Sequence, residues 1–389
     1  WWMTPSFMQT AIHAMPDLNS FFLQRLQLTE VVLPDPETPK PIASDGSATN
    51  IDDARQRAYG LLRQFEAAKT SDAPPADLLS TYVLPALEAL AEVGAQKELR
   101  DLTQQFEGIL SQIKAADSVD LATSIGRLAN LYANQGRYSA AEPLYRKALT
   151  LRQQLLGEAH PAVATSLNNL AGLYYSQGRY SEAEPLYQEA LALRKQLLGE
   201  AHPDVATSLN NLAELYRSQG RYSEAEPLYQ EALALMKQLL GEAHPAVATS
   251  LNNLAALYDS QGRYSEAEPL YQEALELRKQ LLGEAHPDVA ASLNNLAELY
   301  SSQGRYSEAE PLYQQALALM KQLLGEAHPD VATSLNNLAV LYANQGLYHQ
   351  AEPLLVQALE LRVRLLGAKH SDTQSTQQSL ENVRSLMTS

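Results

Sequence analysis

Cysteine is absent from the 389-residue chain, and so are disulfides and thiolate metal ligands. This suits a reducing compartment, and we expect a cytoplasmic protein. No stretch approaches the roughly 18–20 apolar residues of a transmembrane helix. Positive charge is scarce, because 29 lysines and arginines face 45 aspartates and glutamates, for a net charge of −16. Nucleic acids and anionic membranes bind basic surfaces, so neither is an expected partner.

Signatures of catalysis are missing as well. The sequence contains no phosphate-binding glycine loop, no nucleophile elbow and no cluster with the spacing of metal ligands. We therefore predict a protein that is not an enzyme, with no catalytic residues, no metal and no cofactor. The chain opens with Trp1, Trp2 and Met3. No basic segment precedes the mildly apolar residues 7–23, which argues against a signal peptide.

A strict internal repeat dominates the rest of the sequence. The 42-residue string that begins LGEAHPAVATSLNNLAGLYYSQGRY at Leu156 begins again at Leu198, Leu240, Leu282 and Leu324. The copies at 156–197 and 198–239 differ at four positions only: Ala162/Asp204, Gly172/Glu214, Tyr175/Arg217 and Arg194/Met236. Fixed periods of this size are typical of solenoids, in which one unit stacks on copies of itself.

The repeat divides the chain into four parts. Residues 1–53, which end in a stretch rich in proline and small polar residues, are predicted to be a poorly ordered segment and linker. Residues 54–113 have helical spacing and are predicted to form an N-terminal cap with a degenerate repeat. Six repeats fill 114–365. The more polar residues 366–389 are expected to form a capping helix and tail.

Each repeat is predicted to be a pair of helices. Helix A begins at His160-Pro161, with proline near its first position, and ends at Gly178, which suits a left-handed cap. Helix B begins with Ser181-Glu182-Ala183-Glu184, which has the S-x-x-E form of a capping box. The fold class is therefore all-α: a right-handed solenoid of stacked antiparallel helix pairs.

These repeats resemble the tetratricopeptide repeat, and their 42-residue length resembles the kinesin-light-chain type. The resemblance covers about 114–387, and it depends on Leu170, Ala171, Tyr174, Gly178, Tyr180, Ala183, Tyr187 and Ala190. It implies a concave groove, lined by the A helices, that binds peptides. No heptad coiled coil precedes the repeats, so we expect a light-chain-like repeat protein of bacterial origin and not a kinesin subunit.

The histidines that recur once per repeat could suggest a metal site. The paired glutamates could suggest acid–base catalysis. Equivalent residues of neighbouring repeats stack about 10 Å apart, too far for shared zinc ligation. We therefore interpret His160 as the end of the inter-repeat loop and Glu184 as the capping-box residue. Glu182 is interpreted as a carboxylate at a helix N-terminus.

Asparagine pairs within helix A give the sharpest functional signal, because asparagine is a poor residue in a helix interior. Two variable positions, four and seven residues after the first asparagine, lie on the same stripe. The amides are expected either to bind a peptide backbone or to bond to the neighbouring repeat. The candidate groove residues are Asn168, Asn169, Tyr175, Asn210, Asn211, Glu214, Arg217, Asn252, Asn253, Asp259, Asn294, Asn295, Glu298 and Asn336.

The sequence thus predicts a monomeric interaction scaffold that binds a protein or peptide in the groove. Glu214, Asp259 and Glu298 outnumber Arg217 on the variable stripe, so a neutral or basic peptide is favoured, with an aromatic or aliphatic anchor near Tyr175. The alternative is a sensor or regulatory arm of a larger effector whose enzymatic domain lies outside this chain.

Overall fold

The computed structural model describes residues 51–68, 75–92, 99, 101–104, 118–368 and 370–388. These fall into two compact units, one within residues 16–116 and the other from residue 117 onwards. The predicted segment 1–53 lies mostly outside the described residues, and its boundary at 53/54 falls inside the first helix. Every regular element in the described ranges is helical.

In the first unit a long helix packs on a bent one. Helix α3 (Ile51–Ala68) contacts α5 (Leu84–Glu92) and the π-helical turn η1 (Leu79–Val83), which continues α4 (Pro75–Leu78). Its core contains Phe65, Leu79 and Leu87, all at most 1% exposed. The degenerate repeat predicted to reach residue 113 extends beyond the described residues.

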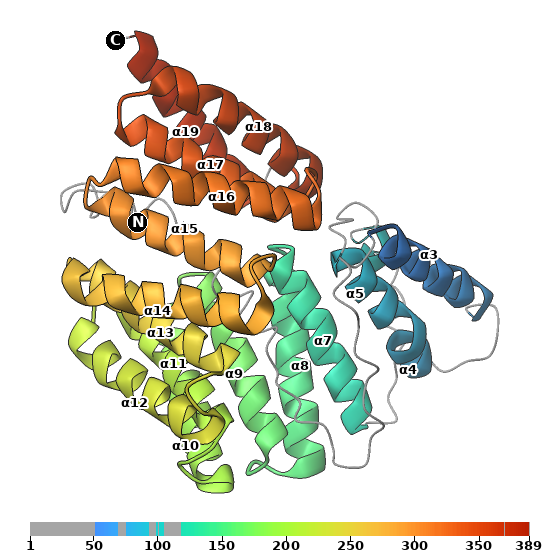
Figure 1. Cartoon of the computed structure of the whole chain (residues 1–389). Helices are drawn as coiled ribbons and strands as arrows, with labels where there is room; N and C mark the ends of the chain where they lie inside the picture. Colours follow the sequence, from blue (N-terminus) through green and yellow to red (C-terminus); the bar gives the residue numbers. More distant parts are fainter. Residues whose placement is uncertain are drawn as a thin grey trace. The chain divides into compact units, whose positions relative to one another are not determined.

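The second unit is a stack of helix pairs, each followed along the chain by the next (Figure 1). Each A helix packs on the B helix that follows it and on the preceding B helix. The pairs are α7 (Val119–Asn134) with α8 (Tyr138–Leu156), α9 (Pro161–Ser176) with α10 (Tyr180–Leu198), α11 (Pro203–Ser218) with α12 (Tyr222–Leu240), α13 (Pro245–Ser260) with α14 (Tyr264–Leu282), α15 (Pro287–Ser302) with α16 (Tyr306–Leu324), and α17 (Pro329–Asn344) with α18 (Tyr348–Leu366). Helix α19 (Ser371–Thr388) closes the array on α18. The fold is therefore an all-α solenoid.

Helix A begins and ends where the sequence predicts. Pro161 is the first residue of α9, and the Nδ1 atom of His160 accepts a hydrogen bond at 3.1 Å from the backbone N–H of Ala162. The same cap recurs in later repeats, so the histidine that ends the loop also caps the helix. Gly178 follows the helix with φ +71°, a conformation that costs a glycine little.

The predicted capping box of helix B is wrong. Helix α10 begins at Tyr180, and no side chain caps its N-terminus. Glu182 instead pairs with Arg179 at 2.6 Å, and Glu184 pairs with Arg221 of the next repeat at 2.8 Å. The S-x-x-E spacing is coincidental, because the glutamates are held by arginines and do not return to the backbone.

Small residues let the helices approach closely. In each pair alanines of both helices face a buried tyrosine, as with Ala171, Ala183, Ala190 and Tyr187, which are at most 1% exposed. Valines and leucines of two successive A helices, α11 and α13, share one buried cluster that joins their repeats.

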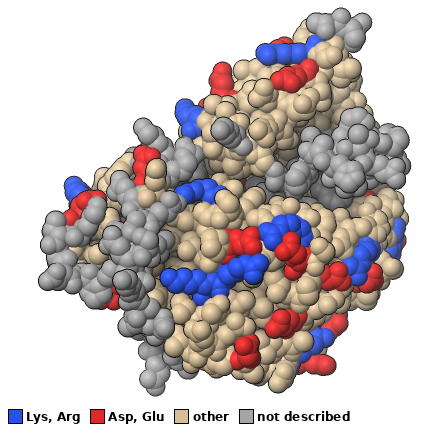
Figure 2. All heavy atoms as spheres, turned by 180° about the vertical axis from the view of Figure 1, so that it is seen from behind, with Lys and Arg blue, Asp and Glu red and all other residues tan. Residues whose placement is uncertain are grey.

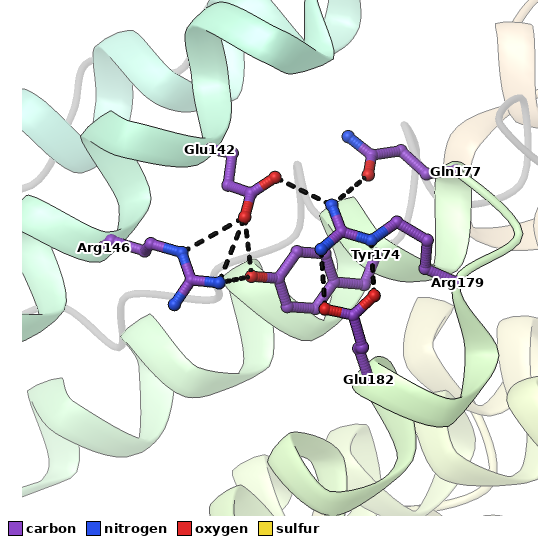
Figure 3. A network of polar contacts seen from close by, with 6 residues as sticks. All are labelled: Glu142, Arg146, Tyr174, Gln177, Arg179 and Glu182. Atoms are coloured by element: carbon purple, nitrogen blue, oxygen red, sulfur yellow. Dashed lines mark hydrogen bonds and ion pairs between the residues drawn. The ribbon is translucent and has the colours of Figure 1, made fainter.

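An arginine clamp joins successive repeats. Charged side chains of opposite sign lie beside one another on the face drawn in Figure 2. In Figure 3, Arg179, in the turn after α9, pairs with Glu142 of the preceding repeat at 2.7 Å and covers the ring of Tyr174, with its guanidinium carbon 4.1 Å from the centroid. The Tyr174 hydroxyl donates to Glu142 at 3.0 Å. Hydrogen bonds, that from Arg179 foremost, hold the pKa of Glu142 below its ordinary value.

The clamp recurs at each later junction up to the last. Arg221, Arg263 and Arg305 each pair with a glutamate of the preceding repeat at 2.8 Å and lie over a tyrosine. In the sixth repeat Leu347 replaces the arginine and is 39% exposed. Its would-be partners are in place, because the Tyr342 hydroxyl still donates to Glu310 at 2.8 Å. The last junction therefore lacks its cation.

We predict that Leu347→Arg stabilises the array. The new guanidinium would pair with Glu310 and cover Tyr342, as its counterparts do, and raise the melting temperature of the C-terminal repeats by about 2 °C. Circular dichroism melts of Leu347→Arg and the neutral control Leu347→Gln would measure this. A gain of the same size in Leu347→Gln, or in Leu347→Arg with Glu310→Gln, would contradict the clamp.

Candidate functional site: the A-helix face

The candidate groove residues all lie on the A helices. These helices contact one another across repeats, α9 with α11 and α11 with α13 for example, as expected for the inner row of a superhelix. The stripe is more buried than expected: Tyr175 is 2%, Arg217 4% and Glu214 7% exposed. Half of the fourteen candidate residues are hydrogen-bonded to another candidate residue.

Two asparagine pairs bridge repeats directly. The amide of Asn211 donates to the Asn168 side-chain oxygen at 2.8 Å, and that of Asn295 donates to the Asn252 oxygen at 2.7 Å. Each bond joins the second asparagine of one repeat to the first asparagine of the preceding repeat. The inter-repeat contact that the alternative interpretation expects is thus present, and a role of these residues in peptide binding stays a prediction.

We call such a pair of asparagines in neighbouring repeats a rung, which is closed when this hydrogen bond forms and open when it does not. The rungs that begin at Asn210 and at Asn294 are open. Asn210 donates instead to Ser250 at 3.4 Å, so its side-chain oxygen and the amide nitrogen of Asn253 are both buried without a partner among the described residues. The oxygens of Asn211 and Asn294 are in the same state. Asn169 and Asn336 are half-buried, and Asn336 accepts from Thr376 of α19 at 3.5 Å.

An arginine near the end of helix B determines which rungs close. Arg194 donates to the Asp204 carbonyl and the Ser208 hydroxyl of the next repeat, both at 3.0 Å. Arg152, Arg278 and Arg362 make equivalent bonds, whereas Met236 and Met320 stand at this position in α12 and α16. After Met236 no arginine occupies Ser250, which therefore accepts from Asn210. Both open rungs, at Asn210 and at Asn294, connect A helices that are separated in sequence by a B helix with methionine at this position, Met236 or Met320.

We predict that Met236→Arg closes the open rung. The new guanidinium would bind Ser250, and the Asn210 oxygen would then accept from the Asn253 amide. The free energy of unfolding should change by less than about 1 kcal/mol, because the neighbouring junctions already hold an arginine there. A crystal structure and urea denaturation of the variant would test this.

Arg194→Ala is the opposite change, because it removes the arginine from a junction that has one. It should cost about 2–3 kcal/mol, because it leaves a buried hydroxyl and carbonyl without their donor. If Asn210 still donates to Ser250 in the Met236→Arg variant, the arginine of helix B does not determine whether a rung closes.

A neutralised cluster occupies the junction between the second and third repeats. Glu214 accepts from Tyr175 at 2.9 Å, from Tyr229 at 2.6 Å and from Arg217 at 2.8 Å. Burial acts to raise the pKa of Glu214, but the charge and hydrogen bonds of Arg217 outweigh it and leave the pKa below its ordinary value. Tyr175 is therefore part of this cluster, rather than an exposed ring ready to receive an anchor.

Two carboxyl groups at the variable positions remain without such compensation. Asp259 and Glu298 are half-buried, and neither has a hydrogen bond or ion pair within the described part of the chain. Burial, followed by repulsion from Glu298, raises the pKa of Asp259 to about 7. Burial also raises the pKa of Glu298.

We predict that stability falls as the pH rises because of Asp259. The folded state, in which the pKa of Asp259 is about 7, keeps a proton that an unfolded chain with an aspartate pKa near 4 has released, so the contribution of Asp259 to stability is greatest below about pH 4 and decreases up to about pH 7. Asp259→Asn should therefore melt about 2 °C or more above the parent at pH 8, with the difference shrinking towards pH 4.5. Melts at several pH values would test this, and a variant less stable at pH 8 would contradict it.

Sequence reasoning missed the side chains that organise this face. Tyr229 follows its partner Glu214 by 15 residues, and this offset recurs as Tyr145 with Asn130, whose side-chain oxygen accepts from that hydroxyl at 2.6 Å. The Arg/Met alternation was visible as one of the four differences between two copies. In the described ranges no group of three or more histidines, aspartates or glutamates could hold a metal, and no helix is long and apolar enough to cross a membrane.

Comparison with known proteins identifies the family. The sequence profile described as "Tetratricopeptide repeat" matches residues 120–196, 172–238, 204–280, 247–322, 288–362 and 330–387. These matches cover more than half of the chain, which therefore belongs to the tetratricopeptide repeat family. No curated protein sequence matches the chain.

Solved structures show similar repeats. BtubC (BKLC) from P. vanneervenii is 30% identical over 60% of this chain and 91% of its own, with a TM-score of 0.46. A kinesin-light-chain-type protein of Podosopora anserina with nearly identical repeats is 29% identical over 53% and 97%, with a TM-score of 0.44. A Rap protein complexed with competence and sporulation factor shares the fold at 17% identity over 86% and 98%, with a TM-score of 0.53. The chain is thus similar in sequence to repeat proteins of the kinesin-light-chain type.

Proposed function

We propose that the chain is a non-enzymatic scaffold whose A-helix face binds an extended peptide segment of another protein. One observation carries the proposal: the buried side-chain amides of Asn210, Asn253 and Asn294 each keep an atom without a partner. An unpaired buried polar group costs free energy, and a peptide backbone supplies both the donors and the acceptors that would satisfy it.

The variable positions support the same proposal. Nearly every other position is copied between repeats, whereas the positions of Glu214 and Arg217 change from copy to copy on this one face. Constant amides can hold any backbone, while variable side chains select a sequence. Acidic residues predominate among the variable charges, so the proposed ligand is neutral or basic.

We predict that Asn210→Ala, Asn253→Ala and Asn294→Ala together weaken peptide binding and leave the fold intact. Peptides would be selected from a displayed random library on the unmodified chain, and their affinities measured by fluorescence anisotropy. A loss of roughly tenfold per satisfied amide is expected, since 1.4 kcal/mol corresponds to a factor of ten. Helicity should persist, because alanine is a better helix former than asparagine.

The matched control removes three amides from the B helices. Gln196, Gln238 and Gln280 are exposed there, and their replacement by alanine should leave affinity unchanged. Equal affinity of the asparagine variant and the parent would show that peptides bind elsewhere. Failure to select any peptide would overturn the proposed function.

A further inference from the structure

The register between neighbouring A helices brings two acids together. Tyr175 of α9 and Glu214 of α11 are in contact through their side chains at 2.9 Å. Asp259 of α13 and Glu298 of α15 occupy the equivalent positions two repeats further on. The same register brings their carboxyl groups near enough to repel each other, and both act electrostatically on Tyr271 and Tyr313.

Asp259 and Glu298 lack the neighbouring arginine that neutralises Glu214. Three residues after Glu214 stands Arg217, but three residues after Glu298 stands Ser301. Among the described residues, Arg217 is the cation that acts electrostatically on both acids, and it is already bound to Glu214. The acids thus have the geometry of the neutralised cluster without its cation.

A buried hydroxyl near these two acids also lacks a hydrogen-bond partner among the described residues. Tyr313 follows Glu298 by 15 residues, as Tyr229 follows Glu214, and it is 1% exposed. The Tyr229 hydroxyl donates to Glu214, whereas the Tyr313 hydroxyl has no partner among the described residues. A buried hydroxyl without a partner beside two carboxyl groups favours a ligand that carries several N–H donors.

We infer that Asp259, Glu298 and Tyr313 form a subsite for a cationic side chain of the bound segment, with arginine preferred to lysine. The inference rests on the proposed function and gives it a chemical specificity. A planar guanidinium can donate to both carboxylates and to the tyrosine oxygen at once, which a single ammonium does less well. It would stand where Arg217 stands in the neutralised cluster.

The test uses a small probe whose binding does not require a peptide to bind along the A-helix face. Acetyl-arginine amide would be titrated into the full chain at pH 8 and followed by NMR, with acetyl-citrulline amide as its uncharged counterpart of nearly the same shape. We expect saturable binding of the arginine probe and none of the citrulline probe. Asp259→Asn with Glu298→Gln should weaken arginine binding by at least roughly tenfold, the loss of one charge-assisted contact.

The matched control neutralises two exposed glutamates in inter-repeat loops, Glu242→Gln with Glu284→Gln, and should bind as the parent does. Absence of arginine binding, equal binding of citrulline, or unchanged binding by the Asp259/Glu298 variant would each overturn the subsite. These results do not depend on whether any peptide is selected. In a selected peptide, replacement of arginine by citrulline should reduce affinity for the parent and not for the Asp259/Glu298 variant.

Discussion

The neutral junction is the constraint on which this array depends. A solenoid repeat contacts only its neighbours, so the charges at each interface between repeats are held in pairs. The arginine of one turn meets this need by binding a glutamate of the preceding repeat while covering a tyrosine ring, as Arg179 does. The motif QGRY and the motif AEPLY are thus two halves of one contact that is completed only when repeats stack. Leu347 interrupts the series within the sixth and last repeat, and beyond it the polar helix α19 contributes an ion pair from Arg384 to Glu352 of α18.

Cohesion between repeats and the proposed peptide binding would use the same amides. The two atoms that form a bridge, the Asn211 nitrogen and the Asn168 oxygen, are satisfied, whereas at the open rung the Asn210 oxygen and the Asn253 nitrogen both stay unpaired among the described residues. The choice is made one helix away, by arginine or methionine near the end of helix B. Arg194 occupies the serine of the next repeat, and Met236 leaves that serine to Asn210. A substitution buried between helices can therefore change the binding face without touching it.

Much of the fold could be predicted because the same helix boundaries recur at a fixed spacing in every copy of the repeat. Pro161 and Gly178 mark the ends of helix A through backbone chemistry that operates within a few residues. The site was harder to predict, because its contacts span one whole repeat or more: Asn168 with Asn211, and Tyr175 with Glu214. The capping box failed for the same reason. Glu184 had a plausible local partner in sequence, but its actual partner, Arg221, lies 37 residues away.

The overall charge of −16 is a poor guide to the chemistry of the binding face. Many glutamates on the B helices are neutralised in place by the clamp arginines, and opposite charges alternate on the surface (Figure 2). Glu214, which the sequence alone would count as an acidic groove residue, is likewise neutralised by Arg217. What distinguishes Asp259 and Glu298 is position: they occupy the same register without the cation. In an array of near-identical copies, two substitutions at one junction are enough to turn a structural ion pair into a site with a charge requirement of its own.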